Sequence, residues 1–375
     1  MSQINTNAIL DASGGTTATV NGFAPTMSNM AGRNRIINGD MRIDQRNAGA
    51  SVTITASTYT LDRWRVAISQ ASKLSVQQNA GSVTPPAGFI NYLGATSLSA
   101  YTVGSGEAFS ILHRIEGFNC ADLGWGTSDA KTVTLSFWVR SSLTGTFGGS
   151  FRNNADNRSY PYSYTISSAN TWEQKTVTVV GDTTGSWETG NGSGITLFFG
   201  LGVGSTLSGT AGAWAGANYI SSTGATSVVG TSGATFYITG VQLEEGSVAT
   251  PFEHRQYGQE LALCQRYYYK TDALNSNSRL GSGYGFTTTI GKFLIQFPVP
   301  MRAAPSSLEQ TGTASDYQIL FRGSSATCSA VPTFGWGGSQ NGGINATVAS
   351  GLTAGDGMMV AALNTGAFFG WSAEL

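Results

Sequence analysis

Hydrophobic and polar residues alternate along much of the chain between residues 34 and 253. In residues 131–140 every second position from Val133 to Val139 is apolar. A period of two places alternate side chains on opposite faces of a strand, so one face of this strand is predicted to be buried. Three more runs, each bounded by Gly, Ser, Asn or Asp, predict strands at residues 172–180, 194–199 and 235–243. Several strands without helical patterns between them predict a two-sheet β-sandwich.

The last of these strands changes its apolar face part-way along. Up to Ile238 the apolar side chains occupy even positions, and from Val241 they occupy odd positions. A regular strand would expose one of the two sets. An extra residue restores the buried face, so we predict a β-bulge at Thr239 and Gly240.

A helical pattern follows the sandwich region. Tyr257, Leu261, Cys264 and Tyr268 are spaced by four, three and four residues, which is the spacing of a short coiled-coil seam. We therefore predict a linking helix over residues 254–270. Its apolar seam is expected either to join three copies of the chain or to pack on its own domain.

Two other segments complete the predicted organisation. Residues 1–33 contain few large apolar side chains, so we expect an arm that becomes ordered only against a partner. Residues 271–375 again carry strand-like patterns, interrupted by the prolines of residues 298–305, which cannot donate to a β-ladder. The prediction is an all-β chain in which a jelly-roll sandwich at 34–253 precedes the linking helix and a smaller β-sandwich at 271–375.

Composition narrows the choice of partner. Charged residues make up 11% of the chain and the net charge is −1, whereas an average globular protein has about 25% charged residues. The absence of a basic cluster argues against nucleic acid as a partner. The 50 glycines follow no collagen period and indicate frequent turns. A neutral, hydroxyl-bearing ligand fits this surface better.

The cysteines and the start of the chain carry less information. Cys120, Cys264 and Cys328 are odd in number and widely spaced, which fits neither a disulfide framework nor a zinc site, so we predict buried thiols. The first residues lack a basic and apolar leader, and no apolar stretch is long enough to cross a membrane. We expect assembly in the cytoplasm without membrane insertion.

Three segments resemble proteins of bacteriophage tail and head fibres: NRIINGDMRIDQR at residues 34–46, GVQLEEGSVATPFE at 240–253 and FGWSAEL at 369–375. The strand at 235–243 and residues 61–65 also resemble strands of jelly-roll carbohydrate-binding modules. These resemblances imply a homotrimeric virion fibre protein, assembled in the host cytoplasm. Its residues 1–33 would attach to other virion proteins, and its β-domains would bind host-surface polysaccharide. A capsid-attached head fibre or decoration protein is the alternative.

Catalysis has little support in the sequence. His113 and His254 lie in no nucleophile motif, and we predict that both are structural. Two carboxylates at a suitable separation could hydrolyse a glycoside, and the candidates are Asp122, Asp156, Asp182 and Glu188. The long repetitive β-helix that is usual in depolymerases is missing. We predict a protein that is not an enzyme and has no metal or cofactor, with a sandwich-fold glycan depolymerase as a second alternative.

Aromatic residues in polar loops are the remaining candidates for function. Sugar rings stack their apolar faces on Trp and Tyr, while their hydroxyls bind Asn and Asp. The predicted glycan-binding residues are Tyr160, Tyr162, Tyr164, Trp187, Trp214, Trp336, Asn153 and Asp156. For each aromatic the alternative is a position in the core or in a trimer interface. Trp336 lies among glycines and is expected to be exposed, whereas Trp371 is expected in the core.

Overall fold

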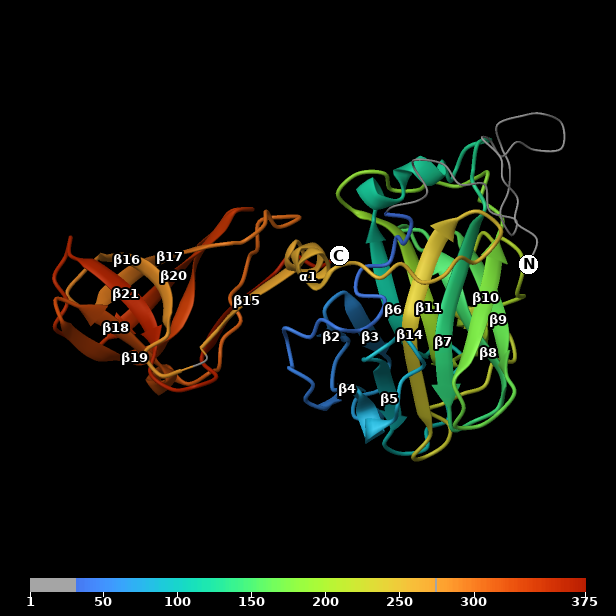
Figure 1. The fold of residues 1–375 in the computed structure, drawn as a ribbon, viewed down its shortest axis with the longest axis horizontal. Coiled ribbons are helices and arrows are strands. Elements are labelled where there is room, and N and C mark those ends of the chain that lie inside the picture. Colours follow the sequence, from blue (N-terminus) through green and yellow to red (C-terminus); the bar gives the residue numbers. More distant parts are fainter. Residues whose placement is uncertain (1–31, 274) are drawn as a thin grey trace, which may run out of the picture. The chain divides into compact units, whose positions relative to one another are not determined.

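The chain divides into two compact units, Met1–Arg255 and Gln256–Leu375, called here the N-terminal and C-terminal units. The computed structural model describes residues 32–273 and 275–375 (Figure 1). The predicted arm, residues 1–33, lies outside the described residues except for Gly32 and Arg33. The Gly32 amide donates to Glu253 at 2.7 Å, and the Arg33 guanidinium donates to the Pro251 carbonyl at 2.7 Å. Gly32 and Arg33 are therefore tied to the last segment of the N-terminal unit.

Two six-stranded antiparallel sheets form the N-terminal unit (Figure 1). In spatial order, the first contains β1 (Val52–Thr53), β4 (Leu74–Gln78), β5 (Leu93–Ser97), β14 (Thr235–Glu245), β7 (Val133–Ser141) and β10 (Glu173–Val179). The second contains β2 (Thr58–Leu61), β3 (Trp64–Ile68), β6 (Ala108–Glu116), β11 (Ser193–Val203), β8 (Gly145–Arg152) and β9 (Ser159–Ile166). Most consecutive strands lie in opposite sheets, so the predicted jelly-roll sandwich is confirmed.

Short elements complete this unit. Strands β12 (Ser208–Gly209) and β13 (Ser221–Ser222) pair in parallel. The 3-10 turns of the unit are η1 (Ala80–Ser82), η2 (Gly117–Asn119), η3 (Ala121–Leu123) and η4 (Ser205–Leu207).

The core lies between the two sheets. The apolar side chains that alternate along β7 from Val133 to Val139 are fully buried there, as the period of two predicts. Trp64 on β3 is also fully buried, and its indole N–H donates to the Asn38 carbonyl at 2.9 Å. Alternation along single strands therefore identified the inward faces correctly.

The predicted bulge in β14 is confirmed. Its pairing with β7 shifts register between Thr239 and Gln242, and Gly240 lies in the left-handed region with φ of 60°. A Cβ atom on Gly240 would stand 2.6 Å from the ring of Phe89. Both the backbone conformation and the space beside it therefore require glycine at this position.

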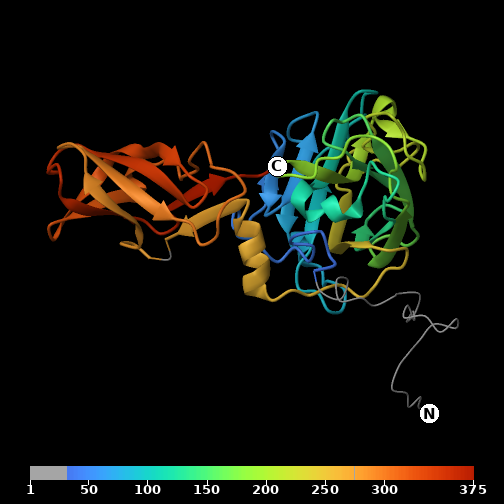
Figure 2. The ribbon, with the colours of Figure 1, turned by 90° about the horizontal axis from the view of Figure 1, so that it is seen from above.

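The C-terminal unit begins with α1 (Tyr257–Gln265) and is otherwise built of strands (Figure 2). Strand β15 (Tyr268–Asp272) pairs with β22 (Phe368–Ser372), and η5 (Ala314–Asp316) precedes β18. The other six strands close a barrel in the order β16 (Arg279–Gly285), β17 (Ile290–Gln296), β20 (Asn341–Val348), β19 (Ser324–Gly337), β18 (Tyr317–Phe321) and β21 (Gly357–Ala362). This unit is β-rich as expected, but six of its strands form a closed barrel where a small β-sandwich was predicted.

Strand β19 is the reason for the closure. Its first residues pair with β18, and from Cys328 onward it pairs with β20. Three register shifts interrupt the pairing with β20, and such irregularities bend a strand. The bent strand closes the barrel between β18 and β20, which would otherwise be the two edges of one open sheet.

The predicted helical seam is shorter than expected. Helix α1 ends at Gln265, because Tyr268 already pairs with β22 and its hydroxyl donates to Glu309 at 2.8 Å. Tyr268 and Cys264 are both buried, while Tyr257 is 60% exposed. The four seam residues therefore do not form one exposed helical stripe. No helix in the described ranges is long and apolar enough to cross a membrane.

All three cysteines are buried thiols, as predicted. Burial raises the pKa of the Cys120 thiol to about 12, and it does the same for Cys328. The thiolate is the reactive form of cysteine, so these two side chains behave as small apolar core groups.

Candidate functional site

Three tryptophans from separate loops of the N-terminal unit pack against one another. Trp125 follows η3, Trp187 lies between β10 and β11, and Trp214 lies between β12 and β13. Their ring centroids are 4.8 Å (Trp125 to Trp187), 5.2 Å (Trp125 to Trp214) and 5.5 Å (Trp187 to Trp214) apart, all edge to face. Tyr160 on β9 contacts Trp214 at 5.2 Å. We call these four residues the tryptophan cluster.

Each indole N–H of the cluster is bound within the unit. Trp125 donates to the Lys131 carbonyl at 2.8 Å, and Trp214 donates to the Val180 carbonyl at 2.7 Å. Trp187 donates to the carboxylate of Asp182 at 3.2 Å. Trp125 is buried, whereas Trp187 and Trp214 remain half-buried. The rings of these two are thus held in fixed orientations while part of their surface stays accessible.

A bidentate ion pair between Arg158 and Asp182 supports the cluster. Arg158 donates from Nε and Nη2 to the two carboxylate oxygens of Asp182 at 2.7 and 2.6 Å. The Arg158 guanidinium also lies 5.8 Å from the ring centroid of Trp214. Burial opposes ionisation of Asp182, but the Arg158 pair and hydrogen bonds from Thr184 and Trp187 outweigh it, so the pKa of Asp182 is lowered. The Asp182 carboxylate is therefore an anion that binds both Arg158 and Trp187.

The turn between β8 and β9 borders the cluster. Asn153 is fully buried, and its amide nitrogen donates to the Ser186 carbonyl at 3.1 Å and to Asn157 at 2.8 Å. Asn153 therefore ties the turn to the loop that carries Trp187, and it is not available to a ligand. Asp156 is exposed in the same turn and pairs with Arg152 at 2.8 Å.

The structure brings five of the eight predicted glycan-binding residues to this place: Tyr160, Trp187, Trp214, Asn153 and Asp156. Tyr162 and Tyr164 instead point into the core between the sheets, the alternative that the sequence left open. The Tyr162 hydroxyl donates to the Phe198 carbonyl at 2.7 Å. Tyr160 belongs to the same core and is 8% exposed, against 1% for Tyr162 and 7% for Tyr164, so none of the three tyrosines offers a ring face to a ligand.

Sequence reasoning missed two members of the site. Trp125 stands between Gly124 and Gly126, the same glycine-flanked pattern that drew attention to Trp336, and it could have been found by that signal. Arg158 has no local signal, because its role depends on Asp182, which is distant in the sequence.

The candidate catalytic groups are all engaged in other contacts. Each of the four carboxylates has a partner: Asp122 with Arg35, Asp156 with Arg152, Asp182 with Arg158, and Glu188 with the Gly190 amide. The His113 ring is buried with Nε2 3.1 Å from the Ile37 carbonyl, and burial together with the charge of Arg63 lowers its pKa well below the usual value. Among residues 32–273 and 275–375, no three His, Cys, Asp or Glu side chains gather as a metal site.

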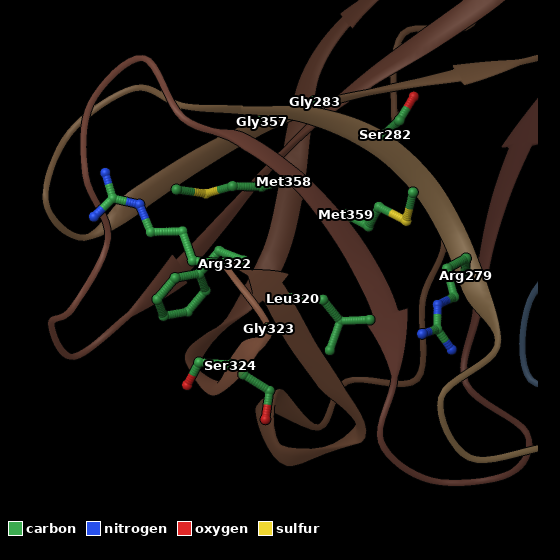
Figure 3. A pocket seen from close by; sticks show the side chains of 12 residues that line it. Arg279, Ser282, Gly283, Leu320, Arg322, Gly323, Ser324, Gly357, Met358 and Met359 are labelled. Carbon is green, nitrogen blue, oxygen red and sulfur yellow. The ribbon is translucent and has the colours of Figure 1, made fainter.

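The C-terminal unit has a hollow on the outer surface of its barrel (Figure 3). The hollow has a volume of about 850 Å³ and is lined by β16, β21, the end of β18 and the start of β19. Its side chains combine apolar groups, serine hydroxyls and two arginines (Figure 3). Trp336, 49% exposed, lies on β19 outside this lining, and a Cβ atom on Gly343 would stand 2.2 Å from its indole. The cavity was not predicted from the sequence.

Comparison with known proteins gave structural likenesses only. No protein-family model and no curated protein sequence matches the chain. Among solved structures, a CBM4 carbohydrate-binding module is 16% identical, with a TM-score of 0.29, and the match covers 56% of this chain and 98% of that chain. A family 11 carbohydrate-binding module of a Clostridium thermocellum cellulase is 12% identical, with a TM-score of 0.27, over 56% and 100% of the two chains. The enzymatically active domain of bacteriophage CBA120 tailspike protein 4 is 10% identical, with a TM-score of 0.28, over 57% and 21%.

Proposed function

We propose that this protein binds glycans through the tryptophan cluster of its N-terminal unit. The observation that carries the proposal is the pair Trp187 and Trp214, two half-buried rings with bound N–H groups. Held rings of this kind lose little conformational freedom when a sugar ring stacks on them. The Arg158 guanidinium lies 5.8 Å from the Trp214 ring centroid and offers a donor to sugar hydroxyls, and the exposed Asp156, in the turn that Asn153 ties to the Trp187 loop, offers an acceptor.

Replacing Trp214 with alanine is expected to weaken binding at least tenfold, because about 1.4 kcal/mol of ring contact is lost. Affinity electrophoresis of the full chain through soluble β-glucan, β-1,4-galactan and xylan measures this change. Trp172→Ala is the matched control, since Trp172 is also half-buried and donates its indole N–H to a loop carbonyl, that of Thr84. Equal losses in the two variants, or no retardation of the unmodified protein by any polysaccharide, would contradict the proposal.

We further propose that the protein is a non-catalytic, homotrimeric virion fibre protein that attaches a phage to its host. The support is the resemblance of residues 34–46, 240–253 and 369–375 to fibre proteins. In this proposal residues 1–33 dock on other virion proteins, and the ligand is host-surface polysaccharide. Immunogold electron microscopy with an antibody against residues 271–375 tests it. Label at the tail ends is expected, label spread over the capsid would favour a head fibre, and unlabelled particles would contradict a virion role.

A further inference from the structure

The hollow on the C-terminal barrel has a floor that crosses three strands, with apolar side chains from β18 and β21 and a serine from β16. Met359 on β21 is the direct cross-strand partner of Ser282 on β16 and of Leu320 on β18. These side chains lie on the outer surface of the barrel, where Met359 is 46% exposed (Figure 3). The floor therefore combines the Met359 thioether and the Leu320 isobutyl group with the Ser282 hydroxyl.

Two arginines stand on opposite sides of this floor (Figure 3). Arg322 binds Asp356 with two contacts, Nε to Oδ2 at 2.5 Å and Nη2 to Oδ1 at 2.9 Å. Arg279 is exposed and donates to the Asn277 carbonyl at 2.6 Å, and in the described ranges no carboxylate lies within 4.0 Å of its guanidinium. The rim therefore carries one uncompensated positive charge, in a chain whose net charge is −1.

The turn that presents Arg322 has an unusual residue for its backbone. Phe321 and Ser324 pair directly, so Arg322 and Gly323 form a two-residue hairpin turn, and their φ angles of 50° and 75° are those of type I′. Such turns favour Asn, Asp or Gly because a longer side chain crowds its own backbone there. Arg322 adopts this conformation while its side chain binds Asp356.

We propose that this hollow binds an acidic saccharide. Arg279 pairs with the sugar carboxylate, and Met359 and Leu320 contact the apolar face of the ring. Ser282 and the Arg322–Asp356 pair provide donors and acceptors for neighbouring hydroxyls. The cavity volume of about 850 Å³ lies within the range of small-molecule sites. The serine hydroxyls and the guanidinium–carboxylate pair favour a polyhydroxylated ring over the side chain of an acidic peptide.

The assignment is independent of the tryptophan cluster, because all the residues that form the hollow belong to the C-terminal unit. Calorimetric titration of the full chain with α-1,4-linked trigalacturonate and with its methyl ester tests it, since esterification removes the charge and keeps the rings. The acid is expected to bind at least fivefold more tightly than the ester. Arg279→Gln should abolish that preference.

Two further variants separate recognition from folding. Arg322→Asn suits the type I′ turn, so it is expected to preserve the melting temperature while weakening both ligands. Lys292→Gln removes a positive charge from the same barrel outside the hollow, and it should leave both affinities unchanged.

The following results would overturn the assignment: equal affinity for acid and ester, no binding of the acid, an equal loss in Lys292→Gln, or equally tight binding of an oligoglutamate peptide. Loss of trigalacturonate binding in Trp214→Ala would also overturn it, because the acid would then sit on the N-terminal unit. Conversely, if Trp214→Ala has no effect on any polysaccharide while Arg279→Gln removes the preference for the acid, the proposal for the tryptophan cluster fails and this assignment stands.

Discussion

Replacing Asp182 with alanine is expected to lower the free energy of unfolding of the N-terminal unit by about 3–5 kcal/mol, because it leaves a charge without its partner. Asp182 is 1% exposed and binds both Nε and Nη2 of Arg158. The same substitution removes the acceptors of Thr184 and Trp187. Arg158 is 21% exposed at its side chain, so water relieves part of its penalty and the lower end of this range is expected. Denaturant titration followed by tryptophan fluorescence measures the change.

Asp122→Ala is the matched control for this variant. The Asp122 carboxylate also pairs with one arginine, Arg35, at 2.5 Å, but its side chain is 50% exposed. Exposed ion pairs contribute about 0–1 kcal/mol to stability, so this variant should remain close to the unmodified protein. Equal effects of the two substitutions would show that the Arg158–Asp182 pair does not hold the loops of the tryptophan cluster.

The lowered pKa of Asp182 adds a dependence on pH with a definite sign. An unfolded chain binds the aspartate proton near pH 3.9, whereas the folded unit binds it only at lower pH. Below about pH 4 the unfolded state holds more protons, so stability falls as the pH falls through the folded pKa. Asp182→Asn cannot titrate at this position. Its deficit in unfolding free energy should therefore be larger at pH 6 than at pH 3, and a constant deficit would contradict the role assigned to the ion pair.

The parts of the fold that could be predicted are those encoded within one strand. Alternation from Val133 to Val139 identifies an inward face because burial repeats every two residues, and the parity change before Val241 shows where a bulge must compensate. Closure of the C-terminal barrel has no such local signal. It depends on β19 exchanging its partner from β18 to β20, and no residue near Cys328 specifies which strand lies beside it.

The candidate sites show the same division between local and distant information. Trp187 and Trp214 could be selected singly as aromatics in polar loops, but their contact with Trp125 depends on three loops that meet only in the folded unit. Tyr162 and Tyr164 were selected as loop aromatics, although their spacing of two residues is itself the signature of an inward strand face.

The hollow on the barrel was beyond prediction for a similar reason. Arg279, Leu320 and Met359 come from three strands that the sequence does not show to be neighbours. The turn at Arg322 and Gly323 is the one element of this site with a local pattern, and its type became evident only from the backbone angles.

Replacing Trp371 with alanine is expected to lower the free energy of unfolding of the C-terminal unit by about 3–5 kcal/mol, the usual cost of emptying a buried tryptophan site. Trp371 on β22 is fully buried, as its alternation with Phe369 predicted. Its ring lies parallel to that of Tyr269, with centroids 6.2 Å apart, and 5.3 Å from that of Phe297. Both contacts are lost in the variant, and the backbone of β22 cannot move into the space without breaking its pairing with β15. Differential scanning calorimetry measures the effect.

Trp336→Ala makes the same chemical change in the same unit and separates burial from residue type. The Trp336 ring is 49% exposed and packs on Gly343, so its removal opens no cavity and should cost less than about 1 kcal/mol. Since the chain divides into two compact units, Trp371→Ala should lower only the transition of the C-terminal unit. A shift of the N-terminal transition by the same amount would show that the two units unfold together. Equal costs for Trp371→Ala and Trp336→Ala would contradict the placement of Trp371 in the barrel core.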